Sequence, residues 1–217
     1  MSETFGATGS FGGRHLPYDE HTIRYYDEHA EAFVSDTQEL SLGQILREFL
    51  ELLPDGGRVL DWGCGSGRDT LFMSCLGYRV TATDASEAMC QTTRELLGHD
   101  ADIRCESFLE LSESDAYDGI WACSSLLHVK PDEIGEAFDR AWDALRCGGV
   151  LYCSFKRGNG LGYRHGRWFT DMEPDGLREA LGGTSFEVVR IWVTNDVRRG
   201  REGEQWVNAL VRKPPMA

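Results

Sequence analysis

The sequence lacks the paired cysteines of a disulfide-stapled or zinc-binding protein. Its seven cysteines include no Cys-x-x-Cys pair, and most of them lie in apolar runs. In such surroundings cysteine behaves as a small hydrophobic residue. An odd, scattered set argues against a disulfide framework, and we expect no metal site. A reducing, cytoplasmic compartment is the simplest expectation.

Long apolar runs and an excess of basic residues are also absent. No stretch of about 18 apolar residues occurs, and the N-terminus has no basic segment followed by an apolar one, so we expect neither a membrane span nor a signal peptide. Lys plus Arg number 22 against 36 Asp plus Glu, a formal charge of -14. Such a field repels phosphate backbones and anionic lipid, so we expect no nucleic-acid or membrane partner.

The 217 residues suit one domain. Residues 1–17 are rich in Gly, Ser and Thr, which predicts a disordered leader. We expect a single domain over 18–217, opened by a helical lid over 18–53. That lid combines an amphipathic helix over 18–34 with a second one after Ser41.

From residue 58 onward, strand and helix patterns alternate. Repeated strand–helix–strand units predict a parallel sheet with helices on both faces, an α/β fold of the Rossmann-like, doubly wound type. The last two strands follow each other without a helix, so they should pair antiparallel. Seven strands are predicted, over residues 58–62, 78–83, 102–105, 118–122, 150–155, 186–193 and 205–212.

The most informative stretch is the glycine-rich turn that ends the first predicted strand. Gly63, Gly65 and Gly67 alternate there after Asp61, and Asp84 ends the second predicted strand. Glycines allow a sharp turn and a close ligand approach, and an acidic residue at that second place accepts ribose hydroxyls. The spacing fails the dinucleotide pattern Gly-x-Gly-x-x-Gly, which opposes a nicotinamide oxidoreductase without excluding it.

This turn resembles motif I of the class I S-adenosylmethionine-dependent methyltransferases, and Asp84 matches that family's second acidic position. The segments 117–121 and 145–151 are similar to its fourth strand and to its turn into the fifth. The resemblance implies a seven-stranded sheet in the order 3-2-1-4-5-7-6 with strand 7 antiparallel. Within the superfamily, the chain is most similar to small bacterial methyltransferases of the tellurite-resistance and thiopurine type.

The resemblance also implies a cofactor, S-adenosylmethionine, and the residues that bind it. Motif I would lie beneath the methionine moiety, Asp84 would hold the ribose, and the residues after the second and third strands would flank the adenine. The end of the fourth strand would border the reactive methyl group. Apart from the resemblance, cation–π attraction predicts that one ring of Tyr25 and Tyr26 faces the sulfonium, with a core aromatic stripe as the alternative. The predicted cofactor-binding residues are Asp61, Gly63, Gly65, Asp84, Ala85, Met89, Ser107, Phe108, Ala122 and Tyr26.

Two further expectations concern the acceptor. His128, just past the fourth strand, suits a general base, with a structural histidine as the alternative. Residues 156–170 carry Arg164 and Arg167 but no Asp or Glu, which predicts a positive rim for an anionic acceptor. The loop between the last two predicted strands adds Arg198, Arg199 and Arg201, diluted by Asp196, Glu202 and Glu204. Two ordinary solvated loops are the alternative.

Taken together, these features predict methyl transfer to a small-molecule acceptor at O, N, S or a metalloid oxyanion, by a monomer or homodimer. No Asn/Asp-Pro-Pro-Tyr signature follows the fourth strand, which argues against adenine or glutamine N-methylation. A non-catalytic S-adenosylmethionine-binding or sensor domain stays open, because this class needs no obligatory catalytic residue.

Overall fold

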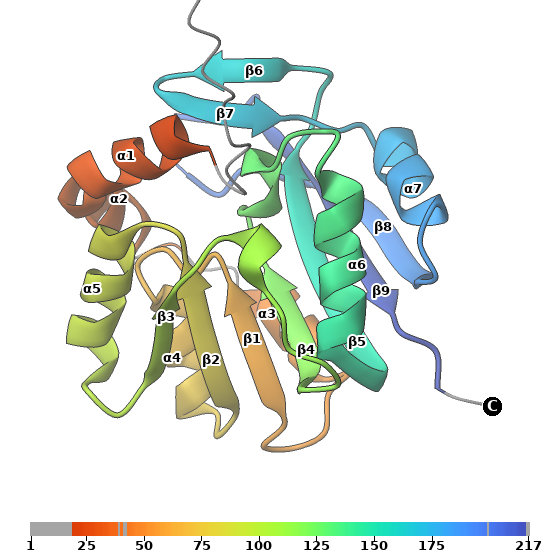
Figure 1. The fold of residues 1–217 in the computed structure, drawn as a ribbon. Helices are drawn as coiled ribbons and strands as arrows, with labels where there is room; N and C mark the ends of the chain where they lie inside the picture. The colour runs from red at the N-terminus through yellow and green to blue at the C-terminus, as the bar shows by residue number, and fades with distance from the viewer. Residues whose placement is uncertain (1–18, 39, 41–42, 199, 216–217) are drawn as a thin grey trace, which may run out of the picture.

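A seven-stranded sheet forms the centre of the computed structural model, which describes residues 19–38, 40, 43–198 and 200–215 (Figure 1). Its order, β3-β2-β1-β4-β5-β9-β8, confirms the predicted class I order. All neighbours run parallel except β9, which is antiparallel to both β5 and β8. The strands are β1 (Arg58–Trp62), β2 (Arg79–Asp84), β3 (Asp102–Cys105), β4 (Tyr117–Ala122), β5 (Leu145–Lys156), β8 (Glu187–Asn195) and β9 (Gln205–Arg212).

The central strands are apolar on both faces because helices cover both. Val59 and Leu60 are neighbours on β1, are both fully buried, and belong to two different core clusters. Helices α3 (Gly43–Leu50) and α4 (Arg68–Cys75) pack on the Val59 face, whereas α6 (Ile134–Ala144) and α7 (Pro174–Gly182) pack on the Leu60 face. Helix α5 (Glu87–Leu97) lies against β2 and β3. This alternation follows from the two-residue period of a strand.

The predicted helix over 18–34 is instead two helices, α1 (Glu20–Glu28) and α2 (Ala30–Thr37). Asp19 caps α1, since its Oδ2 accepts from the backbone N–H of Thr22 at 2.9 Å. His29 ends α1 because it leaves the helical conformation, and its Nδ1 donates to the Tyr25 carbonyl at 2.8 Å. A side chain that competes for a helix carbonyl in this way favours termination.

The expected lid is also shorter than 18–53. In α3, Leu46, Phe49 and Leu50 are buried in the core on the sheet face, so this helix is scaffold. Of the three helices described over residues 19–50, α1 and α2 border the open end of the sheet (Figure 1). The predicted leader over 1–17 lies outside the described residues.

A hairpin stands where the sequence predicted only a loop. Strands β6 (Leu161–Arg164) and β7 (Arg167–Thr170) pair antiparallel through a two-residue turn. Both turn residues, His165 and Gly166, have positive φ, 50° and 80°, as hairpins of this length require. The hairpin lies above the carboxyl ends of the sheet strands, where β7 packs on α1 and on the short helix η2 (Leu126–His128) (Figure 1).

Candidate active site

The carboxyl ends of the parallel strands open into a cavity of about 940 Å³. Its other walls are α1 and α2, the β6–β7 hairpin and the loop between β8 and β9. Open parallel sheets bind ligands at this edge. Every predicted site residue except Ala122 lines it: Tyr26, Asp61, Gly63, Gly65, Asp84, Ala85, Met89, Ser107, Phe108, His128, Arg164 and Arg167.

The motif I glycines serve packing as well as ligand access. Gly63 has a φ of 86°, and a Cβ there would lie 2.4 Å from the Cβ of Ser125. Ser125 is held in place by its Oγ, which donates to the Trp62 carbonyl at 2.7 Å. A Cβ on Gly65, which has a φ of 54°, would lie 3.3 Å from Cε1 of Phe33 on α2. Both glycines therefore combine a positive φ with a close neighbour, Ser125 at Gly63 and the Phe33 ring at Gly65.

Asp84 ends β2 and is already oriented by the backbone. One carboxylate oxygen accepts from the N–H of Gly65 at 3.0 Å, and the other accepts from the N–H of Ser86 at 2.9 Å. Two such bonds leave a carboxylate with unused acceptor capacity. Burial raises the pKa of Asp84, and the two N–H groups partly offset that effect. A ligand that donates hydroxyl protons here would stabilise the charged form.

Asp61 lies below the same loop with only 2% of its surface exposed. It accepts a hydrogen bond from the Thr70 hydroxyl at 2.5 Å. Burial and the nearby Asp69 raise its pKa to about 7. Asp69 is itself held by Arg68 and by the indole N–H of Trp121 at 2.9 Å. Asp61 is thus an acid whose ionised form a neighbouring cation would favour.

One wall residue that the sequence did not predict is Glu106, directly after β3. Its Oε1 is buried without a hydrogen-bond partner among the described residues, and burial raises the pKa of its carboxyl group. Ser107 and Phe108 follow it in the wall, and the Ser107 N–H donates to Glu110 at 2.7 Å. The unpartnered acceptor is typical of a place that a ligand N–H fills. Its signal in the sequence was only an acidic residue after the third strand.

Ala122 does not lie where the resemblance predicted. It is fully buried in the cluster beneath α6 and does not line the cavity. Strand periodicity explains this position, because β4 places Ile120 and Ala122 on that one face of the sheet. Past the strand end, Cys123, Ser124 and Ser125 turn into the cavity wall instead.

The side chains of Tyr26 and His128 are in contact, although the two residues are 102 positions apart in the sequence. His128 Nδ1 lies 2.6 Å from the Trp168 carbonyl, so this nitrogen carries the proton and donates. Nε2 therefore accepts from the Tyr26 hydroxyl at 2.9 Å. Burial lowers the pKa of His128 to about 4, so the ring is neutral at physiological pH and its lone pair faces the tyrosine.

Arg167 completes this group. Its Nη1 donates to the Tyr26 hydroxyl at 3.3 Å, and its guanidinium lies 4.5 Å from the Tyr25 ring centroid and 5.2 Å from that of Phe169. Its Nε is buried without a hydrogen-bond partner among the described residues. Among the arginines and lysines of the described cavity wall, Arg167 alone has no carboxylate partner.

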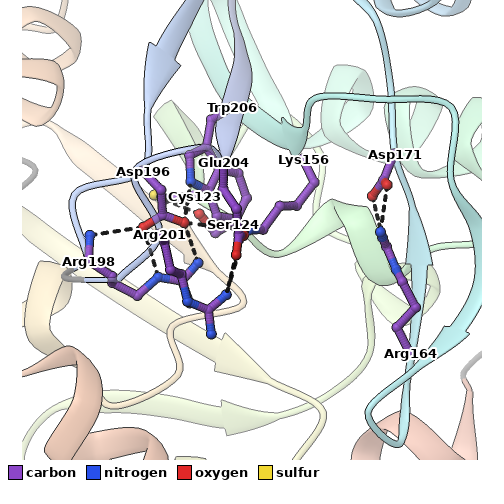
Figure 2. Close-up of polar contacts among 10 residues, drawn as sticks. All are labelled: Cys123, Ser124, Lys156, Arg164, Asp171, Asp196, Arg198, Arg201, Glu204 and Trp206. Atoms are coloured by element: carbon purple, nitrogen blue, oxygen red, sulfur yellow. Dashed lines mark hydrogen bonds and ion pairs between the residues drawn. The ribbon is translucent and has the colours of Figure 1, made fainter.

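The expected positive rim is largely neutralised, which is a second correction. Arg164 forms a two-pronged ion pair with Asp171, one residue beyond the stretch that lacks acids (Figure 2). Arg157 pairs with Glu173 at 3.0 Å, and Lys156 pairs with Asp196 and Glu204. The carboxylates come from segments that the local sequence window did not include.

The comparisons with known proteins agree with this geometry. A family model described as a methyltransferase domain matches residues 59–149. Phosphoethanolamine N-methyltransferase of Triticum aestivum is 27% identical over 188 residues, 76% of this chain and 37% of that protein. An uncharacterized methyltransferase of Staphylococcus carnosus is 30% identical over 95 residues, 44% of this chain and 45% of that one. The chain spans less than half the length of these curated relatives.

Solved structures show the same fold. The 1,6-didemethyltoxoflavin-N1-methyltransferase of Burkholderia thailandensis, bound to S-adenosylhomocysteine, has a TM-score of 0.72 and 24% identity, covering 88% of this chain and 85% of that one. The [4+2]-cyclase SpnF has a TM-score of 0.73 and 18% identity, covering 89% and 95%.

The match of a methyltransferase-domain model to residues 59–149, the sheet order and the glycine-rich turn support a class I S-adenosylmethionine-dependent methyltransferase domain. Within that class, the narrower likeness to the tellurite-resistance and thiopurine type stays a prediction. In the described part of the chain, no helix has the length and apolar character to cross a bilayer. The same part contains no group of three or more side chains suited to a metal ion.

Proposed function

We propose that the protein transfers the methyl group of S-adenosylmethionine to a small-molecule acceptor that carries an anionic group. The observation that supports an anionic acceptor is Arg167, whose guanidinium lines the cavity without a carboxylate partner among the described residues. A chain of net charge -14 that keeps one such cation in its cavity is suited to an oxyanion there.

The cofactor fits the opposite end of the cavity. Asp84 would accept the ribose hydroxyls, Met89 and Phe108 would flank the adenine, and Glu106 would accept from its amino group. Asp61 would lie beneath the methionine moiety. S-adenosylmethionine supplies a methyl group already activated on sulfur, so the protein mainly has to orient and desolvate the reactants.

Tyr26 and His128 provide a place for the acceptor's proton. The Tyr26 hydroxyl passes its own proton toward His128 Nε2 as it accepts one from the acceptor. With a pKa of about 4, His128 is a weak base. It therefore takes the acceptor's proton only as methyl transfer makes the acceptor atom more acidic. The Trp168 carbonyl fixes the ring tautomer that this path needs.

The relatives support an acceptor of this kind. The wheat relative's name gives phosphoethanolamine as its acceptor, a small amine with an oxyanion. Helices α1 and α2 contribute Ile23, Tyr26 and Phe33 to the cavity wall, and we propose that they act as a lid over both ligands.

The test is a transfer assay with methyl-labelled cofactor and matched acceptor pairs. Each pair contains an amine or alcohol with a carboxylate or phosphate group and the neutral analogue without it. We expect label in anionic members only. Label confined to neutral members would contradict the acceptor class, and tight cofactor binding without any transfer would favour the sensor alternative.

A further inference from the structure

A second cluster of charges lies on the acceptor side of the cavity, separate from Arg167. Lys156 ends β5, and Asp196, Arg198, Arg201 and Glu204 belong to the β8–β9 loop or its edges (Figure 2). All five line the cavity. Lys156 pairs with Asp196 at 3.4 Å and with Glu204, and Arg201 pairs with Glu204 at 3.3 Å. Arg198 also pairs with Asp196, so three cations share two carboxylates.

The two carboxylates differ in how firmly they are held. Asp196 has 1% of its side chain exposed and accepts from the Arg198 guanidinium at 2.9 Å and from the Trp206 indole at 3.1 Å. Glu204 is 42% exposed, and its bonds to Arg201 are long, at 3.3 and 3.4 Å. Asp196 is thus part of the loop's structure. The Glu204 carboxylate is instead a partly exposed partner of Lys156 and Arg201, and an exposed ion pair of this kind contributes little to stability.

The loop backbone does not depend on that side chain. The Glu204 N–H donates to the Arg201 carbonyl at 2.8 Å, and its carbonyl accepts from the Asp196 N–H at 2.8 Å. The Glu204 carboxylate can therefore leave Lys156 and Arg201 while the main chain stays in place.

The cations remain under-compensated. The pKa of Lys156 is lowered to about 8 by burial and by Arg198 and Arg201, despite Asp196. Burial, Arg198 and Arg167 likewise lower the pKa of Arg201. Arg167 and the cluster line the same cavity.

We infer that Lys156 and Arg201 form an oxyanion subsite for the acceptor, and that the Glu204 carboxylate occupies this subsite until an anion displaces it. The inference rests on the proposed function, because it concerns the acceptor side of the same cavity. It makes Glu204 an internal competitor: an acceptor with a doubly charged oxyanion gains more from displacing it than a singly charged one.

The probe is inorganic sulfate, whose charge is constant from pH 6 to 9. Titration calorimetry is carried out on the full chain saturated with S-adenosylhomocysteine, comparing wild type with Glu204→Gln. We expect sulfate to bind about threefold more tightly to Glu204→Gln, since displacing a partly exposed ion pair has only a small cost. Glu202→Gln, which removes one charge from the same loop, is the matched control and should stay within about 1.5-fold of wild type.

Lys156 provides the second arm. Lys156→Met should weaken sulfate binding about tenfold or more, while Lys156→Arg should retain it. In wild type, affinity should fall as the pH rises through 8, because Lys156 loses its proton there, whereas Lys156→Arg should show no such fall. Equal sulfate affinity of wild type and Glu204→Gln, or an equal gain in Glu202→Gln, would overturn the subsite.

These results are separable from the proposed function. Sulfate binding that responds as expected in a protein that methylates no anionic acceptor would retain the subsite and refute the function. Methyl transfer to anionic acceptors with sulfate affinity indifferent to Glu204 and Lys156 would do the reverse.

Discussion

The two ends of the cavity are built differently. The cofactor end consists of backbone and acids: the N–H groups around Asp84, the buried Asp61 and the unpartnered Glu106. The acceptor end contains long cationic side chains from three elements, Lys156 of β5, Arg167 of β7 and Arg201 of the β8–β9 loop. The acids of the first end suit the sulfonium and ammonium groups of the proposed cofactor, and Arg167, which has no carboxylate partner among the described residues, suits the oxyanion of the proposed acceptor. We therefore expect acceptor specificity to depend on the side chains of the acceptor end.

The largest expected effect joins the two ends. Tyr26→Phe removes the hydroxyl that lies between His128 and Arg167 and keeps the ring. We expect kcat to fall about a hundredfold, the ordinary scale for losing a positioned proton-transfer group. S-adenosylhomocysteine affinity should change less than about twofold, and both quantities follow from transfer kinetics and calorimetry.

Tyr25→Phe is the control, because it removes a hydroxyl from the adjacent ring. If Tyr26 only supports packing, both variants will lose activity alike and the pH profile of kcat will keep its shape. A changed profile in Tyr26→Phe alone assigns the hydroxyl to proton transfer. Retention of full kcat by Tyr26→Phe would remove the dyad from the mechanism.

The second effect is confined to the cofactor end. Asp84→Ala leaves the ribose hydroxyls without their charged acceptor, which costs about 1.5–3 kcal/mol. Calorimetry should therefore show S-adenosylhomocysteine binding at least about tenfold weaker. The sulfate affinity of the acceptor end should stay as in wild type, provided the two ends are independent.

A comparison variant addresses folding. Asp84→Asn keeps the shape and the two N–H contacts in part, so it should bind the cofactor with intermediate affinity. Unchanged affinity in a folded Asp84→Ala protein would contradict the ribose assignment.

The sequence predicted the cofactor end of the cavity better than the acceptor end. The glycine turn was predicted from the residues themselves, because residues 58–84 form one strand–helix–strand unit with short-range signals, whereas the sheet order was implied by the resemblance to a known family. Asp84 and Gly65 fall within that unit, and the structure brings them to 3.0 Å. The prediction that Ala122 binds the cofactor was wrong because this residue lies on the face of β4 that α6 covers.

The acceptor end was harder to predict because its contacts are long-range. Tyr26 and His128 are 102 residues apart, and Lys156 and Asp196 are 40 apart. The charge pattern of residues 156–170 suggested a free positive rim, yet Asp171 neutralises Arg164 from the next strand end. The His165-Gly166 turn was the one local signal that would have indicated the hairpin.

The smallest of these effects tests whether Arg167 differs from its neighbour Arg164. Arg167→Met should raise the acceptor's KM about fivefold and leave cofactor affinity unchanged, since the guanidinium without a carboxylate partner is the one free to hold an oxyanion. The effect is smaller than that of Asp84 because Arg167 is only half-buried and Lys156 remains nearby to attract the anion. Added salt should shrink the difference between variant and wild type, as screening weakens the contribution of a partly exposed charge.

Arg164→Met is the matched control: its charge is already balanced by Asp171, so its KM should change less than about twofold. An equal rise of KM in both variants would mean that the whole rim attracts the acceptor and that Arg167 has no special role. No rise in either would place the acceptor's charge elsewhere in the cavity.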